Sequence, residues 1–208
     1  MNLMSAGLQK AAGDRLRGFL SSMTSNPFKR VMTGLEITAI IQSSSATMAL
    51  TFIMLNMGWI PFPVAAAMVL GENIGTTITA NIAASVGNVA SKRAALAHTV
   101  FNLFGVAWAL ILFKPFTAMI GKIIELRGYL NPAFADFAVE SSTSATGVAA
   151  LYGLSMLHTL FNVINTCILI WFPGAIERIV TTVIKGRKEN AEEVHKLKYI
   201  GSVAEYIG

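Results

Sequence analysis

Apolar residues gather in long runs along the chain, and polar residues divide these runs into four regions. Residues 1–30 mix leucine and phenylalanine with basic residues, which predicts an amphipathic interfacial helix followed by a Ser/Asn/Pro turn. Residues 31–91 are largely apolar, but two polar clusters and the GWIPFP segment (58–63) interrupt them, and its prolines cannot continue a helix. Residues 92–184 contain two long uncharged runs, and residues 185–208 form a charged tail.

The two uncharged runs, 94–113 and 153–172, are each long enough for a conventional transmembrane helix. We expect the hydroxyl-rich segment between them, 121–147, to be an exposed polar loop. The apolar stretch after residue 63 is too short to span a bilayer, so region 31–91 suits broken or re-entrant helical hairpins. These patterns predict an all-α polytopic membrane protein that combines such hairpins with transmembrane helices.

Composition agrees with a membrane location. Of the 208 residues, 54% are hydrophobic and only 13% are charged, about half the charged share of a soluble domain. The net charge of +5 does not indicate nucleic acid, because no lysine or arginine occurs between Arg30 and Lys92. Basic residues instead flank the apolar runs, which favours a cytoplasmic tail and the plasma membrane. The single cysteine, Cys167, excludes a disulfide framework.

The first polar cluster is QSSS, which consists of Gln42, Ser43, Ser44 and Ser45. Serines in a membrane helix can bond back to a carbonyl one turn earlier or allow close helix packing. Consecutive serines point in different directions around a helix, however, so one packing face cannot use all three. The run therefore favours the tip of a broken helix that faces a polar cavity.

The second cluster is GENIGTT (71–77), in which we expect Thr76 and Thr77 to open a new helix whose N-terminus could bind an anion. The alternative is a buried turn in which Asn73 and the threonines only cap a helix. Region 31–91 contains two acids, Glu36 and Glu72, and no lysine or arginine. A bound anion would then need hydroxyl donors and a small cation such as Na⁺. This pattern predicts cation-coupled anion transport, with Glu72 as a possible pathway acid.

A short repeat links the two uncharged runs. HTVFN (98–102) and HTLFN (158–162) lie at similar places in the two runs, which predicts equivalent packing roles. We interpret His98 and His158 as hydrogen-bonded partners between helices rather than as proton carriers.

QSSSATMAL followed by GENIGTTITA resembles the paired signature of the type II sodium/phosphate cotransporter family, particularly its bacterial members. AGLQKAAGDRLR, KRAALAHTVFN and the closing HTLFN are also similar to that family. The resemblance implies a secondary transporter in the bacterial inner membrane, built from inverted repeats that each carry a re-entrant hairpin with QSSS. It implies that inorganic phosphate is bound at Gln42, Ser43, Ser44, Ser45, Asn73, Thr76 and Thr77, and that Na⁺ is bound among Gln42, Ser43, Ser45, Asn73 and Thr76. Na⁺ would be the coupling ion, with no other cofactor and no enzymatic activity.

This chain departs from the family pattern because it has one QSSS motif where members carry two, and because it lacks a PhoU-like domain. We therefore expect half of an inverted-repeat transporter, with a homodimer completing two half-sites. The alternative is a non-transporting scaffold or regulatory relative. A hydrolase with a serine nucleophile and a histidine base is disfavoured, because no G-x-S-x-G elbow accompanies the serines.

Overall fold

The structure, a computed structural model, describes residues 26–57, 59–128 and 145–186, and all regular secondary structure in these ranges is helical. The helices are α2 (Pro27–Ile41), α3 (Ser44–Asn56), α4 (Phe62–Ser85), α5 (Val89–Ile111), α6 (Phe113–Leu126), α7 (Ala145–Leu169) and α8 (Pro173–Val183). The prediction of an all-α protein is confirmed for this part of the chain.

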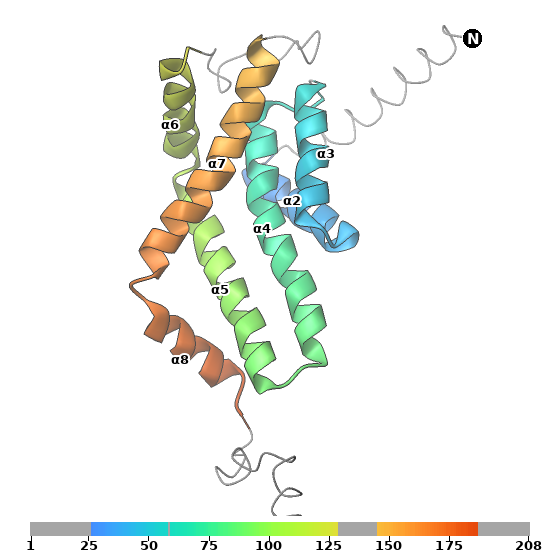
Figure 1. Cartoon of the computed structure of the whole chain (residues 1–208), viewed down its shortest axis with the longest axis vertical. Helices are drawn as coiled ribbons and strands as arrows, with labels where there is room; N and C mark the ends of the chain where they lie inside the picture. The colour runs from blue at the N-terminus through green and yellow to red at the C-terminus, as the bar shows by residue number, and fades with distance from the viewer. Residues whose placement is uncertain (1–25, 58, 129–144, 187–208) are drawn as a thin grey trace, which may run out of the picture.

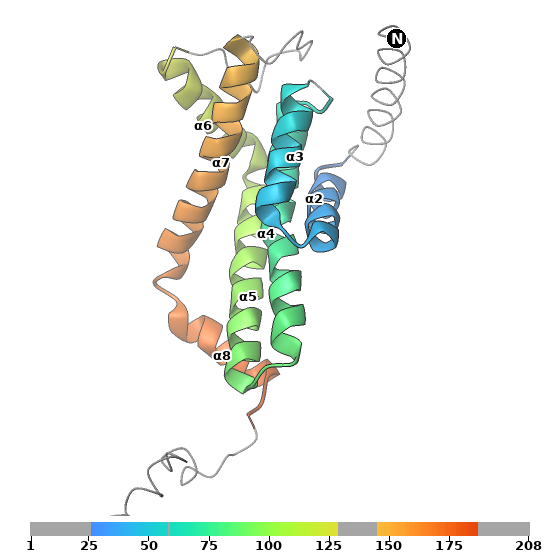
Figure 2. The same cartoon turned by 45° about the vertical axis from the view of Figure 1, so that its right-hand side comes forward.

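Helix α4 is the centre of the arrangement, because α2, α3, α5 and α7 all contact it. Figures 1 and 2 show α3, α4, α5 and α7 running along the long axis of the molecule, with the short α2 beside the middle of α4. The first half of α4 is buried nearly without interruption from Val64 to Glu72. Helix α4 follows Pro61 and has Pro63 in its first turn. A backbone N–H at that position would have no acceptor within the helix, so proline is tolerated there.

Helices α2 and α4 cross at very short range, and glycines make this possible. A Cβ atom at Gly34 would overlap the carbonyl group of Met68, and one at Gly71 would overlap the carbonyl group of Val31. One turn further along α4, a Cβ atom at Gly75 would lie 2.6 Å from the Cβ atom of Thr38. Only glycine at these positions lets the two backbones touch.

Helices α5, α6 and α7 meet around an aromatic cluster. The ring of Trp108 stacks on Phe161 at a centroid distance of 5.8 Å and meets Phe116 edge-on at 5.6 Å. The indole N–H of Trp108 donates to Asn165 Oδ1 (3.2 Å), and Asn165 Nδ2 donates to the carbonyl of Phe101 (3.0 Å). The side chain of Asn165 is fully buried against Gly105, so α5 and α7 are joined by a satisfied polar contact inside an apolar core.

Two helices in the described residues are long and apolar enough to cross a membrane, Val89–Ile111 and Gly147–Leu169. They overlap the two predicted runs, but each begins earlier in the chain than expected. The loop predicted over 121–147 is wrong at both ends, because residues 121–126 belong to α6 and residues 145–147 begin α7. Helix α6 is amphipathic, with Ile120 and Ile124 buried. Residues 129–144 lie outside the described part.

The other predicted boundaries are only partly covered by the structure. Residues 27–30 begin α2, with the Oδ1 of Asn26 accepting from the N–H of Phe28 (3.1 Å), so the first region does not extend to residue 30. Residues 1–25 of the predicted interfacial helix and turn (1–30) and residues 187–208 of the predicted charged tail (185–208) lie outside the described residues.

Candidate functional site

The chain breaks between α2 and α3, where the QSSS cluster begins. Gln42 has φ +58° and ψ +24°, a left-handed conformation that no other described non-glycine residue adopts. Its N–H donates to the carbonyl of Thr38 (2.7 Å), which closes the last turn of α2. Ser43 is extended, with φ −146°, and the next helix starts at Ser44. A left-handed residue that is not glycine costs about 1–2 kcal/mol, so the turn is held under strain.

The three serines have different roles around this break. Ser43 caps α3, because its Oγ accepts from the N–H of Ala46 (3.3 Å) and its carbonyl accepts from Thr47 Oγ1 (3.0 Å). The hydroxyls of Ser43 and Ser45 share a hydrogen bond of 3.3 Å. Ser44 and Ser45 form the first turn of α3 and face a cavity. The side chain of Gln42 is exposed and does not line that cavity.

GENIGTT does not break its helix, and the prediction that Thr76 and Thr77 open a new helix is wrong. All seven residues lie inside α4, where the side chains bond back to carbonyls of the preceding turn. Asn73 Nδ2 donates to the Val69 carbonyl (2.9 Å), and Thr76 Oγ1 donates to the Glu72 carbonyl (2.8 Å). The polar groups are thus satisfied without a break, and the glycines serve the contact with α2.

A cavity of about 260 Å³ brings the two clusters together. Its lining consists of Ser44, Ser45 and Met48 from α3, Glu72, Asn73 and Thr76 from α4, and His158 from α7. No lysine or arginine lines it within the described ranges. Since a water molecule takes about 30 Å³ in the liquid, the space is large enough for a small oxyanion with a cation.

Glu72 is the most deeply buried polar group of this cavity, with 2% of its surface exposed. Its Oε1 accepts a hydrogen bond of 2.7 Å from Thr51 Oγ1, which is also fully buried. Its Oε2 is buried and has no hydrogen-bond partner among the described residues. A buried carboxyl oxygen without a partner is unfavourable unless a proton, a cation or water joins it.

Thr77 does not belong with the other site residues. Its Oγ1 donates to the carbonyl of Ile74 (2.7 Å), and its side chain lines a separate hollow of about 620 Å³ between α4 and α5. In that hollow Asn81 Nδ2 donates to Thr99 Oγ1 at 2.6 Å. Of the residues that the resemblance implies for Na⁺, the cavity gathers Ser45, Asn73 and Thr76, but not Gln42 or Ser43.

His158 is a cavity residue that sequence reasoning assigned to helix packing. In the described part of the chain, neither its ring nor that of His98 takes part in a hydrogen bond, so the predicted bonds between helices are not present. The HTVFN/HTLFN repeat does have a common local geometry. Asn102 Nδ2 donates to the His98 carbonyl (3.0 Å), and Asn162 Nδ2 donates to the His158 carbonyl (2.8 Å). The repeat was the only signal that marked His158.

Comparison with known proteins assigns the sequence to a family. The profile of the Na⁺/Pi-cotransporter family matches residues 1–135, which include both polar clusters. The chain belongs to the Na⁺/Pi-cotransporter family. Since this is a family of transporters, the chain has a membrane location.

Several curated proteins are similar to the chain. The uncharacterized protein YqeW of Bacillus subtilis is 36% identical over 66% of this chain and 43% of its own length. YjbB of Escherichia coli K12, named as a candidate inorganic phosphate export protein, is 26% identical over 81% of this chain and 27% of its own length. The rat sodium-dependent phosphate transport protein 2B is 35% identical over 52% of this chain and 16% of its own length.

The chain spans less than half of the length of each of these relatives. No solved structure matches it. Family membership thus rests on sequence, and the cavity is described from this chain alone.

Proposed function

We propose that this Na⁺/Pi-cotransporter family member takes part in sodium-coupled transport of inorganic phosphate across a plasma membrane, the inner membrane in a bacterium. The observation that carries the proposal is the cavity between Ser44, Ser45, Glu72, Asn73 and Thr76. It joins both polar clusters in a space that, among the described residues, is lined by the acid Glu72 and by no lysine or arginine.

The α3 side of the cavity suits an anion. Ser44 and Ser45 contribute hydroxyl groups, and they occupy the first turn of α3, where backbone N–H groups have no partner within the helix. The N–H of Ala46 is already bonded to Ser43, which leaves the N–H groups of the two lining serines for a ligand. Hydroxyl and N–H donors at a helix N-terminus bind phosphate oxygens without a basic side chain.

The α4 side of the cavity suits a cation. The Thr76 hydroxyl and one N–H of the Asn73 amide donate to backbone carbonyls, and both side chains keep an oxygen, Oγ1 and Oδ1, that can accept a cation. Glu72 Oε2 adds an unpaired carboxyl oxygen beside them. Hard oxygen ligands suit Na⁺. A bound Na⁺ would also offset the repulsion between phosphate and Glu72, which is the physical basis for coupling the two ligands.

The membrane arrangement that we propose is multi-pass. Helices α2 and α3 have 15 and 13 residues, fewer than the roughly 20 that span a bilayer, so the pair forms a broken element whose turn lies at membrane depth. That turn exposes Gln42 together with Ile40 and Ile41. A second copy, inserted in the opposite direction, would cover this surface and supply the other half-site of an inverted-repeat transporter.

The test is uptake of ³²P-phosphate by the full chain reconstituted in liposomes, with and without an inward Na⁺ gradient. We expect uptake that depends on Na⁺, and we expect Ser44→Ala combined with Ser45→Ala to abolish it. Ser155→Ala is the matched control, because this exposed serine of α7 lies outside the cavity and its hydroxyl donates to the Leu151 carbonyl of its own helix.

Uptake that is indifferent to Na⁺ would refute the coupling. Absence of uptake from a folded and inserted chain would favour the alternative, a non-transporting scaffold or regulatory relative. Uptake that persists in the double serine variant would show that these hydroxyls serve helix packing instead.

A further inference from the structure

A second cavity, of about 810 Å³, lies between the N-terminal end of α5 and helix α8. It shares no lining residue with the candidate transport site. Figure 1 shows α8 running obliquely beside the lower half of α5. Apolar side chains of the two helices face each other across it, with Ala94 and Ala97 from α5 and Ile176 and Val180 from α8. We call this space the α5–α8 groove.

Two charged side chains line the α5–α8 groove, one of each sign. Arg93 is half-buried, and its Nε donates to the carbonyl of Ile184 (3.0 Å) at the end of α8. Its Nη2 lies against Gly186, and neither Nη group has a hydrogen-bond partner in the described residues. Glu177 is exposed at the rim, and no ion pair joins it to Arg93 in the described part of the chain. Both groups are thus available to a ligand.

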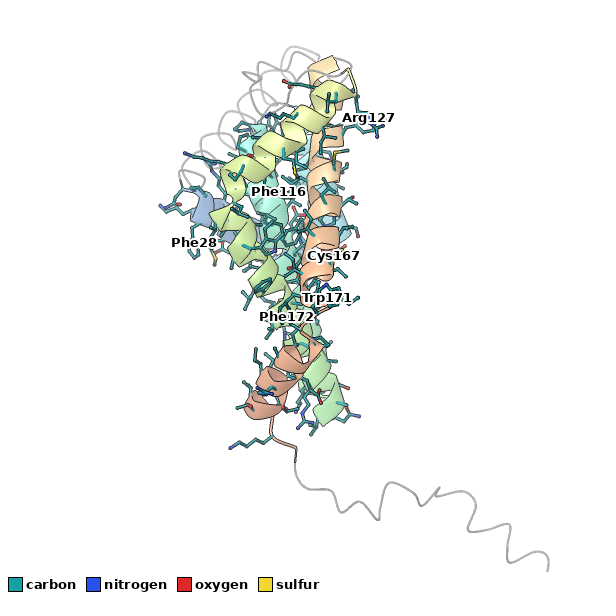
Figure 3. All side chains as sticks on the ribbon, turned by 90° about the vertical axis from the view of Figure 1, so that its left-hand side faces the viewer. Phe28, Phe116, Arg127, Cys167, Trp171 and Phe172 are labelled. Atoms are coloured by element: carbon teal, nitrogen blue, oxygen red, sulfur yellow. The ribbon has the colours of Figure 1, made fainter. Side chains whose placement is uncertain are left out.

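The groove lies at the level where lipid head groups are expected. Figure 3 shows Trp171 and Phe172 at the turn between α7 and α8, and both are strongly exposed (81% and 56%). Exposed aromatic side chains next to a transmembrane helix are typical of the membrane–water interface. Lys92 precedes Arg93 in α5 and Lys185 follows the end of α8, so both lie at the other end of α8 from these aromatic residues. For a member of a membrane transporter family, this combination indicates a lipid-facing position.

We propose that the α5–α8 groove binds an aminophospholipid of the phosphatidylethanolamine type. The phosphate accepts hydrogen bonds from the Nη groups of Arg93, the primary ammonium donates to the carboxylate of Glu177, and an acyl chain covers the apolar wall formed by Ala97, Ile176 and Val180. The lining carries one positive and one negative group, and the zwitterionic head group matches both.

The same two groups disfavour other phospholipids. The head group of phosphatidylglycerol offers no cation to Glu177, so its negative charge would lie beside an unpaired acid. The quaternary ammonium of phosphatidylcholine has no N–H with which to bond a carboxylate. The groove thus distinguishes three common head groups by charge and by hydrogen-bond donors.

The proposal is tested by quantifying the lipids that stay with the full chain after extraction from nanodiscs holding equal amounts of the three phospholipids. We expect phosphatidylethanolamine to be retained in preference to the other two. Glu177→Gln should lower its retention relative to phosphatidylcholine by about tenfold, since a charge-assisted hydrogen bond is lost. Arg93→Gln should lower the retention of all three lipids by removing the phosphate ligand.

Two exposed residues of α6 provide matched controls, because Lys122→Gln and Glu125→Gln remove the same charges far from the groove. Both should retain lipids as the unchanged chain does. Glu177→Gln also leaves the Arg93–Ile184 bond in place, so a loss of α8 packing cannot account for its effect. Equal retention of phosphatidylcholine, preference for phosphatidylglycerol, or an unchanged selectivity in Glu177→Gln would each overturn the proposal. The readout requires no phosphate transport.

Discussion

A methyl group added at Gly71 would meet the backbone of α2. The new Cβ atom would overlap the carbonyl oxygen of Val31, and it would lie 2.8 Å from the Val31 carbonyl carbon and 2.9 Å from the amide nitrogen of Leu35. These are backbone atoms, so no rotamer change can relieve the contact. Gly71→Ala would therefore force α2 away from α4.

The size of the effect follows from these distances. Ordinary contact between such atoms is about 3.5 Å, so the Leu35 nitrogen alone requires α2 to move by about 0.6 Å, and the overlap with the Val31 oxygen requires more. A gap of about 0.5–1 Å forfeits a quarter to a half of the local dispersion energy. Overpacking of a tight core costs about 1–3 kcal/mol and occasionally more. Because backbone overlaps backbone here, we expect about 3 kcal/mol, which lowers the unfolding midpoint by about 6–12 °C for a chain of this size.

The assay is thermal unfolding of the full chain in one detergent, followed by tryptophan fluorescence. Gly174→Ala is the matched control, because Gly174 also lies in a helix and a Cβ atom there would meet nothing within 4 Å. Both variants gain helix propensity, so the difference between them isolates the contact with α2. Equal midpoints for the two variants would refute the close crossing of α2 and α4.

Three further predictions concern buried polar groups and the strained turn. Thr51→Val should lower stability by about 1–3 kcal/mol in thermal unfolding, because both carboxyl oxygens of Glu72 are then unpaired. The loss should be smaller when Thr51→Val is made in a Glu72→Gln background. An equal loss in both backgrounds would show that the two side chains are not coupled. Asn165→Leu should lower stability by about 3 kcal/mol, because the indole N–H of Trp108 loses its acceptor; a stable variant would contradict this. Gln42→Gly should leave stability unchanged or raise it by about 1 kcal/mol, since glycine adopts the left-handed turn freely; a large loss in the same assay would refute the strain.

Several features of the fold could be predicted because they depend on neighbouring residues. The uncharged runs within α5 and α7 can be recognised from composition alone. At the QSSS cluster, a glutamine is followed by serines, which cap helices readily, and the chain does break between Ile41 and Ser44. The exposed loop predicted over 121–147 was wrong in its first part, residues 121–126, for a related reason. Its helical period, with Ile120 and Ile124 on the buried side, becomes clear only once α7 is there to cover it.

In the candidate site, too, the sequence predicted some features and the tertiary structure decided others. The pairing of QSSS with GENIGTT was visible in the sequence, but the second cluster was expected to break its helix. Asn73 and Thr76 can bond to carbonyls of their own helix, and Gly71 is needed for contact with α2, so the helix continues. The sequence alone could not decide this, because glycine and hydroxyl residues occur both at breaks and at close helix crossings.

By itself, the sequence determined the class of this protein: apolar runs, sparse charge and two polar clusters specify a helical membrane transporter relative. Only the tertiary structure decided which polar groups meet. It placed His158 of α7 beside Glu72 of α4, left Thr77 in a different hollow, and joined Arg93 to the end of α8. The physical reason is the distance along the chain over which each effect acts. Propensity, capping and periodicity act over a few residues, whereas a cavity is made by faces of helices that packing brings together from distant parts of the chain.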